Sequence, residues 1–293
     1  MTTHFPALLL VVTAIAAAAP EAAARQPASA TPAPAAQQDG KDKLGEWPML
    51  KDTDKERVQA LAGQFRKQDE QLQADAKQQL IALGDGAMPL LMQLASDRAD
   101  NTNAQLFEVF DAVLGPRHAA LMARETKKPR VELRRYLSRR LCGFGDRDLA
   151  PVFDTLTKDK DEATAFHAWL GLLAQGRKDA VAPVLAYTKT RWNDVGALVA
   201  SALTPARSQA LGEAVFEAIA KAAAVDQMAG LRLLRYTMVK EQGVILRRYL
   251  EAGEHTVKRE AVNTARVLHG EPPIENLSVF QAIEQAKQWL QKL

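Results

Sequence analysis

The chain has 293 residues, of which 47% are apolar and 6% aromatic, and its formal net charge is +3. This small positive excess is below the charge of a dedicated nucleic-acid-binding protein. The single cysteine, Cys142, excludes an intramolecular disulfide, so a folded domain must rely on its hydrophobic core. Alanine and leucine dominate the apolar residues, which favours helices over strands.

The first 24 residues resemble a secretory signal peptide. Residues 7–19 form an apolar run that is too short to cross a bilayer as a helix, and small residues before position 25 permit cleavage after Ala24. No lysine or arginine precedes the run, so a disordered alanine-rich tail is the alternative. The pattern predicts a protein exported to the periplasm or the extracellular space that does not span the membrane.

The following segment, residues 25–46, is rich in alanine, proline and glutamine and has few large apolar side chains. Such a composition buries too little surface to offset the entropy lost on ordering. We expect a disordered tether here, followed by a folded domain over residues 47–293.

Amphipathic helical patterns begin at residues 53–56, which have the spacing of a capping box, and continue to the end of the chain. Three of the expected apolar faces are Leu72, Ala76, Leu80 and Leu83; Leu106, Phe110 and Val113; and Val257, Ala261, Ala265 and Leu268. Successive helical pairs are predicted to begin near Asp69, Thr102, Arg130, Asp161, Asn193, Asp226 and Glu254. The period of about 31 residues is typical of stacked helical hairpins.

The last helix is predicted over residues 278–292, because Ser278 and Gln281 have the spacing of a capping box. We expect this helix to bury Phe280, Ile283 and Leu290. Its other face is polar, as the terminal unit of a repeat array requires.

The repeat is clearest over residues 148–176. A helix with proline in its first turn, Ala150-Pro151-Val152-Phe153, precedes an acidic turn and an alanine- and leucine-rich helix that ends at Gly176. This stretch resembles a short bacterial HEAT repeat. The resemblance implies an all-α fold: a right-handed α-α superhelix, or α-solenoid, of about six to seven HEAT-like hairpins. Helices gathered into a closed bundle are the alternative.

Basic residues cluster between Arg124 and Arg147, and a second group includes Arg232 and Arg235. On an ideal helix Arg135 and Arg139 face solvent, whereas Arg140 lies closer to the apolar side. A positive stripe of these residues would attract acidic protein segments or anionic glycans. The alternative is a solvated face on which the arginines pair with Asp and Glu.

Four aromatic residues are candidate anchors for a partner, since aromatic and arginine side chains contribute much of the energy of protein interfaces. They are Trp169, Trp192, Tyr187 and Tyr236. Packing between repeats is the alternative role for each of them.

No metal-ligand, phosphate-loop or dinucleotide motif occurs in the sequence. Cys142 and His167 are interpreted as packing residues. We therefore expect a non-enzymatic scaffold without a cofactor, which binds a protein or peptide along its helical surface. The alternative is an envelope enzyme that acts on glycans or in maturation, with Glu108 or Glu132 as its acid; a lyase like the HEAT-like proteins that attach bilins ranks last.

Overall fold

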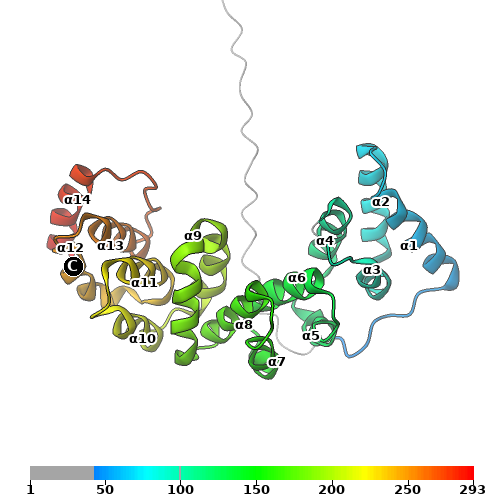
Figure 1. Ribbon diagram of the computed structural model, residues 1–293, viewed down its shortest axis with the longest axis horizontal. Helices are drawn as coiled ribbons and strands as arrows, with labels where there is room; N and C mark the ends of the chain where they lie inside the picture. Colours follow the sequence, from blue (N-terminus) through cyan, green and yellow to red (C-terminus); the bar gives the residue numbers. More distant parts are fainter. Residues whose placement is uncertain (1–42, 99) are drawn as a thin grey trace, which may run out of the picture. The chain divides into compact units, whose positions relative to one another are not determined.

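The computed structural model describes residues 43–98 and 100–293, and throughout this part of the chain the secondary structure is helical, without strands (Figure 1). The α-helices are α1 (Asp52–Gln64), α2 (Glu70–Leu83), α3 (Met88–Leu94), α4 (Asn101–Val113), α5 (Ala119–Glu125), α6 (Val131–Cys142), α7 (Ala150–Leu156), α8 (Glu162–Ala174), α9 (Val181–Leu203), α10 (Gln209–Ile219), α11 (Ala224–Thr237), α12 (Arg247–Leu250), α13 (His255–Leu268) and α14 (Val279–Lys292). Short 3-10 helices precede or follow several of them: η2 (Gly84–Ala87), η3 (Pro116–His118), η4 (Arg147–Leu149), η5 (Lys178–Ala180), η6 (Thr204–Ala206) and η7 (Lys240–Leu246). The predicted signal peptide lies outside the described residues.

Longer helices recur at the predicted period and pack on one another in series. Helices α2, α4, α6, α8, α11 and α13 begin within one or two residues of the predicted positions. The exception is the start near Asn193, because α9 runs through that position with only a kink at Arg191, whose φ of −119° is not helical. We call α2, α4, α6, α8, the second half of α9, α11 and α13 the long helices.

Acidic side chains begin several of the long helices. Asp69, Asp100 and Asp161 accept hydrogen bonds from backbone N–H groups in the first turns of α2, α4 and α8, and Glu254 does so for α13. A carboxylate at this position satisfies an otherwise unpaired donor and interacts favourably with the helix dipole. These acids therefore fix where four of the long helices begin, whereas α6 and α11 begin without a side-chain cap.

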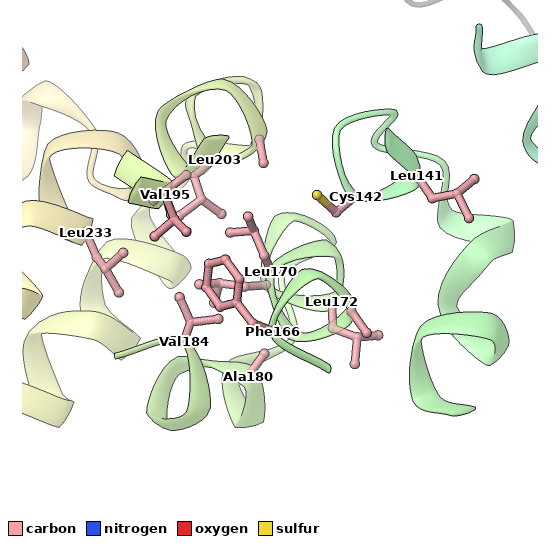
Figure 2. Close-up of a cluster of buried hydrophobic side chains, with 14 of the residues drawn as sticks. Leu141, Cys142, Phe166, Leu170, Leu172, Ala180, Val184, Val195, Leu203 and Leu233 are labelled. Carbon is pink, nitrogen blue, oxygen red and sulfur yellow. The ribbon is translucent and has the colours of Figure 1, made fainter. Parts of the chain in front are cut away.

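The buried side chains form one continuous cluster from Val58 in α1 to Trp289 in α14. Figure 2 shows the part of the core where α8 and α9 meet, with Phe166, Leu170 and Val184 directed toward one another. Because each helix pair has apolar residues on more than one side, successive pairs share a single core.

Short and long helices approach closely where a glycine faces an apolar side chain. A Cβ added at Gly171 in α8 would lie 2.6 Å from the ring of Phe153 in α7, and one at Gly230 in α11 would lie 2.3 Å from Ile219 in α10. These distances are shorter than van der Waals contact, so only glycine permits the observed packing.

Three local predictions are wrong. Helix α1 begins at Asp52 after Lys51, which makes no side-chain cap, so Thr53 does not form the predicted capping box. Leu72 of the predicted apolar face is 41% exposed. In α14 the capping box of Ser278 is present, but the helix buries Ala282, Ala286 and Trp289, while Phe280 is 73% exposed.

The structure also extends the ordered part of the chain toward the N-terminus. Lys43 and Leu44, which the composition assigned to the tether, make ion pairs and a backbone hydrogen bond with residues 117–148. The packed domain therefore begins at least four residues before the predicted boundary at residue 47.

Candidate functional site

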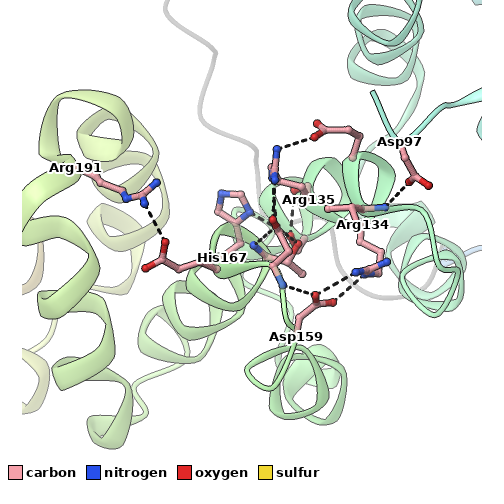
Figure 3. A network of polar contacts seen from close by, with 12 residues as sticks. Asp97, Arg134, Arg135, Asp159, His167 and Arg191 are labelled. Atoms are coloured by element: carbon pink, nitrogen blue, oxygen red, sulfur yellow. Dashed lines mark hydrogen bonds and ion pairs between the residues drawn. The ribbon is translucent and has the colours of Figure 1, made fainter. Parts of the chain in front are cut away.

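Part of the predicted basic cluster lies on α6, where Arg134 is bound to the acidic turn before α8 (Figure 3). The Arg134 guanidinium donates to both carboxylate oxygens of Asp159, at 2.8 Å and 3.1 Å, and to the backbone carbonyl of Pro129 at 2.6 Å. Bidentate pairing of this kind fixes both the distance and the orientation of the two groups. Arg134 thus connects one long helix to the start of the next.

Arg135 is also paired, contrary to the prediction that it faces solvent. Its guanidinium donates to Asp161 at 2.6 Å and 3.2 Å and to Glu132 at 2.7 Å. Burial alone would raise the pKa of Asp161, but hydrogen bonds from Arg135 and Thr164 lower it to about 2. Asp161 remains ionised as the N-cap of α8, and Arg135 neutralises it.

Arg139 and Arg140 differ from these two arginines and from each other. Arg139 is exposed and makes no ion pair with an acid of residues 43–98 or 100–293. Arg140 lies 3.3 Å from Asp111 and donates to the carbonyl of Leu114 at 2.7 Å, which confirms the predicted placement near the apolar side. Among the arginines of α6, Arg139 thus presents positive charge without an acidic partner in the described part of the chain.

The same kind of ion pair recurs between other long helices. These pairs are Lys77–Glu108, Lys189–Asp226 at 2.6 Å, Arg191–Glu162 at 2.9 Å and Arg232–Glu260 at 2.8 Å. Each connects residues of neighbouring helices rather than residues of one helix. Of these four basic residues, Arg232 belongs to the second basic group of the sequence analysis, and its ion pair agrees with the alternative of an ion-paired face at that position.

Arg235, a predicted binding residue, is buried in the contact between α11 and α13. Its side chain is 6% exposed and pairs with Glu260, which Arg232 also contacts. Burial lowers the pKa of Arg235, and the charge of Glu260 opposes this shift. Arg235 therefore stabilises a helix contact and is not available on the surface.

Two groups of aromatic and arginine side chains lie on α9: Trp192 with Tyr236 and Arg232 of α11, and Tyr187 with Arg191. The Trp192 indole stacks on Tyr236 with a centroid distance of 6.4 Å and an interplanar angle of 16°. The Arg232 guanidinium lies 5.6 Å from the Trp192 ring centroid, and Arg191 lies 4.9 Å from that of Tyr187. We call these five residues the aromatic–arginine patch.

The side chains of the patch are fixed in place by their neighbours. A Cβ at Gly196 would lie 3.0 Å from the Trp192 ring, so the indole rests directly on the backbone of its own helix. Tyr187 stacks on Phe166 of α8 at 4.1 Å. All three aromatic members of the patch are partly exposed, so a partner would meet rings whose orientation is already set.

Trp169 lies apart from the patch. It is partly buried and packs against the hydrophobic core from α8. Sequence reasoning identified Trp192, Tyr187 and Tyr236 as candidate anchors and placed Arg232 in the second basic group, but it missed Arg191. A signal for Arg191 was present in the sequence, since it lies four residues after Tyr187, about one helical turn.

The reactive side chains considered from the sequence occupy packed or ion-paired positions. His167 is 6% exposed and its Nδ1 lies 3.1 Å from the Ser138 hydroxyl, and burial lowers its pKa to about 4. Burial raises the pKa of Cys142 to about 12. Glu108 and Glu132 pair with Lys77 and Arg135. At neutral pH this arrangement provides a neutral histidine and a protonated thiol, neither of them open to solvent.

Two findings concern the whole described region. Residues 43–98 and 100–293 contain no group of three or more His, Cys, Asp or Glu side chains placed to hold a metal ion. None of the helices there has both the length and the apolar character that a membrane crossing requires. Compared with known proteins, the chain matches no family model, and no curated protein is significantly similar to it.

Proposed function

We propose that this protein is an exported HEAT-like scaffold that binds a protein or peptide partner along its long helices and catalyses no reaction. In this proposal the helical pairs form a right-handed α-solenoid of about six to seven units. The recurrence of the long helices at about 31 residues and their packing in series support the repeat architecture. Export is proposed from the sequence pattern of residues 1–24.

The aromatic–arginine patch is the observation on which the binding function rests. Tryptophan, tyrosine and arginine are the residue types that most often dominate the energy of protein interfaces. Since stacking and cation–π contacts already hold these side chains, binding would cost little side-chain entropy. Such a surface favours specific recognition over a broad affinity for charge.

The ion pairs limit what kind of partner the patch would select. Arg191 pairs with Glu162, and Arg232 shares Glu260 with Arg235, so much of the positive charge is compensated and the rings would supply most of the affinity. Acidic segments and anionic glycans would find uncompensated charge at Arg139. We therefore place a protein or peptide with exposed apolar or aromatic side chains first among the candidate partners.

The proposal is tested by affinity capture from the native envelope with the full mature chain. Trp192→Ala removes the tryptophan of the patch, and Arg139→Glu reverses the uncompensated charge. Phe280→Ala is the matched control, because it removes an exposed aromatic side chain from α14, outside the patch. Circular dichroism verifies that each variant is folded.

We expect wild type and Phe280→Ala to retain the same partner and Trp192→Ala to lose it. Loss with Arg139→Glu alone would move the binding surface to α6 and contradict the role of the patch. Equal capture by all variants would contradict the proposal for both surfaces.

A further inference from the structure

The N-terminal end of the described chain lies across the ends of several short helices. We call residues 43–50 the strap. Lys43 pairs with Asp146 and Asp148 at η4, at 2.9 Å and 2.8 Å. The Leu44 N–H donates to the carbonyl of Arg117 in η3 at 2.9 Å, and Arg124 of α5 donates to the Gly45 carbonyl at 2.8 Å. Figure 1 shows the strap in blue, running from α1 past α5.

The second half of the strap lies against η2 and η3. Trp47 stacks on His118 with a centroid distance of 5.8 Å and an interplanar angle of 17°. His118 is 1% exposed, and its Nε2 lies 3.2 Å from Asp85. At Gly86 an added Cβ would lie 3.0 Å from the Pro48 carbonyl oxygen, so the two backbones are in direct contact.

Together, these contacts define one surface that binds the strap as an extended chain. We call it the edge surface; it is formed by Asp85, Gly86, Arg117, His118, Arg124, Asp146 and Asp148. Asp146 and Asp148 bind a cation, and the His118 ring stacks on an aromatic side chain. The Arg124 guanidinium donates to the peptide backbone, and the Arg117 carbonyl accepts from it. These groups match a basic residue four positions before a Trp-Pro pair.

The strap is only partly buried on this surface. None of its residues is fully buried, and its ion pair with Asp148 is largely exposed to solvent, whereas Trp47 and Leu50 pack against the hydrophobic core. Helix α1 directly after it buries Val58 completely. Exposed ion pairs and single backbone hydrogen bonds contribute little stability each, so displacement of the strap would cost mainly the contacts of these two apolar side chains.

The strap also leaves part of its surroundings empty. A pocket of about 310 Å³ lies beside it, lined by Glu46 and Trp47 of the strap and by Leu121, Arg124 and Glu125 of α5. A peptide with a larger side chain next to its tryptophan would fill this space. The surface thus has room for a larger side chain than the strap places there.

We propose that the edge surface is an extended-peptide binding site that the strap blocks in cis, and that its ligand is a partner peptide with a basic residue four positions before Trp-Pro. This inference does not depend on the aromatic–arginine patch, which lies on α9 and α11. The strap then acts as an autoinhibitory segment that a partner peptide must displace.

The test measures binding of a fluorescently labelled peptide of residues 43–50 to the full chain by anisotropy. In Lys43→Glu/Trp47→Ala the strap loses its cation and its ring, while the edge surface is unchanged. In Gly86→Val the surface itself is blocked, so both the strap and the free peptide are excluded. If the double variant is unstable, the single variant Lys43→Glu takes its place in the binding measurement.

Hydrogen exchange at the Leu44 amide reports whether the strap is displaced, because this N–H is bonded to Arg117. We expect rapid exchange in both the double variant and Gly86→Val. The double variant should bind the peptide with a dissociation constant on the order of 100 μM. Wild type should bind about tenfold more weakly, since a tethered strap competes at an effective concentration of ~1 mM. Gly86→Val should not bind.

Absence of saturable binding by the double variant up to ~1 mM peptide, with its strap displaced, would overturn the proposal. Equal affinity of wild type and the double variant would also overturn it, because the strap would then not block the site. Light scattering would show a dimer of wild type if two chains exchanged their straps. In that case the ligand of the edge surface would be a second copy of the chain, and the proposed partner peptide would be wrong.

Discussion

Removal of Glu260 tests the energetic role that the structure assigns to the ion pairs between long helices. The Arg235 side chain is 6% exposed, the Glu260 side chain is 13% exposed, and a terminal guanidinium nitrogen of Arg235 donates to Glu260, whereas its buried Nε has no hydrogen-bond partner. Glu260→Ala would therefore leave a guanidinium buried at the contact between α11 and α13 without its counter-charge. Arg232, which also pairs with Glu260, would lose its partner in the same step.

The expected cost follows from the burial of Arg235. Removing one partner of a buried ion pair typically destabilises a protein by about 3–5 kcal/mol, whereas removing an exposed partner costs about 0–1 kcal/mol. Glu162 provides the matched control, because its pair with Arg191 has the same chemistry but the two side chains are 70% and 47% exposed. Glu162→Ala should thus be nearly neutral.

Thermal and urea unfolding followed by circular dichroism measures both variants. We expect Glu260→Ala to lower Tm by about 10 °C and Glu162→Ala by less than about 3 °C. Arg235→Leu/Glu260→Leu should restore most of the loss, because an apolar pair needs no counter-charge. A cost below about 1 kcal/mol for Glu260→Ala, or equal costs for both single variants, would refute the reasoning from burial.

Three further predictions concern single side chains. Gly171→Ala places a Cβ within 2.6 Å of the Phe153 ring and should destabilise the folded protein by about 1–3 kcal/mol. Gly63→Ala is the control and should stabilise the folded protein, because no heavy atom lies within 4 Å of the added Cβ. Urea denaturation measures both variants. Cys142 should react with a thiol reagent such as DTNB only after unfolding, because burial raises its pKa to about 12; rapid reaction of the folded protein would contradict this. Burial lowers the pKa of His167 from 6.5 to about 4, so on acidification the histidine is protonated in the unfolded chain before it is protonated in the folded protein. The free energy of unfolding should therefore fall as the pH drops from about 6.5 toward 4. The same pH dependence in His167→Gln would show that His167 is not its cause.

Local patterns in the sequence determined the type and order of the elements. The starts near Asp69, Asp161 and Glu254 were predictable, because a capping acid precedes an amphipathic segment at each of them. The helix after Ser278 was predictable for the same reason. At residue 53 the pattern misled, because the spacing of a capping box does not ensure that its first residue is the N-cap.

The candidate site was predictable only in part. The sequence indicated Trp192, Tyr187 and Tyr236 by residue type alone, because aromatic side chains contribute much of the energy of protein interfaces. It could not show that Arg232 lies over the Trp192 ring, since that contact depends on how α9 and α11 pack. It also placed Arg135 in solvent, because the face of one helix does not reveal the acids of the next.

The sequence by itself determined that the chain is helical, where most helices begin and at what period they recur, since these properties depend on residues within a few turns of one another. The tertiary structure alone decided which charges neutralise one another, which aromatic rings meet and where the strap lies. Those contacts join residues about 25 to 105 positions apart, as in Arg235–Glu260 and Lys43–Asp148, and no local periodicity encodes such a pairing.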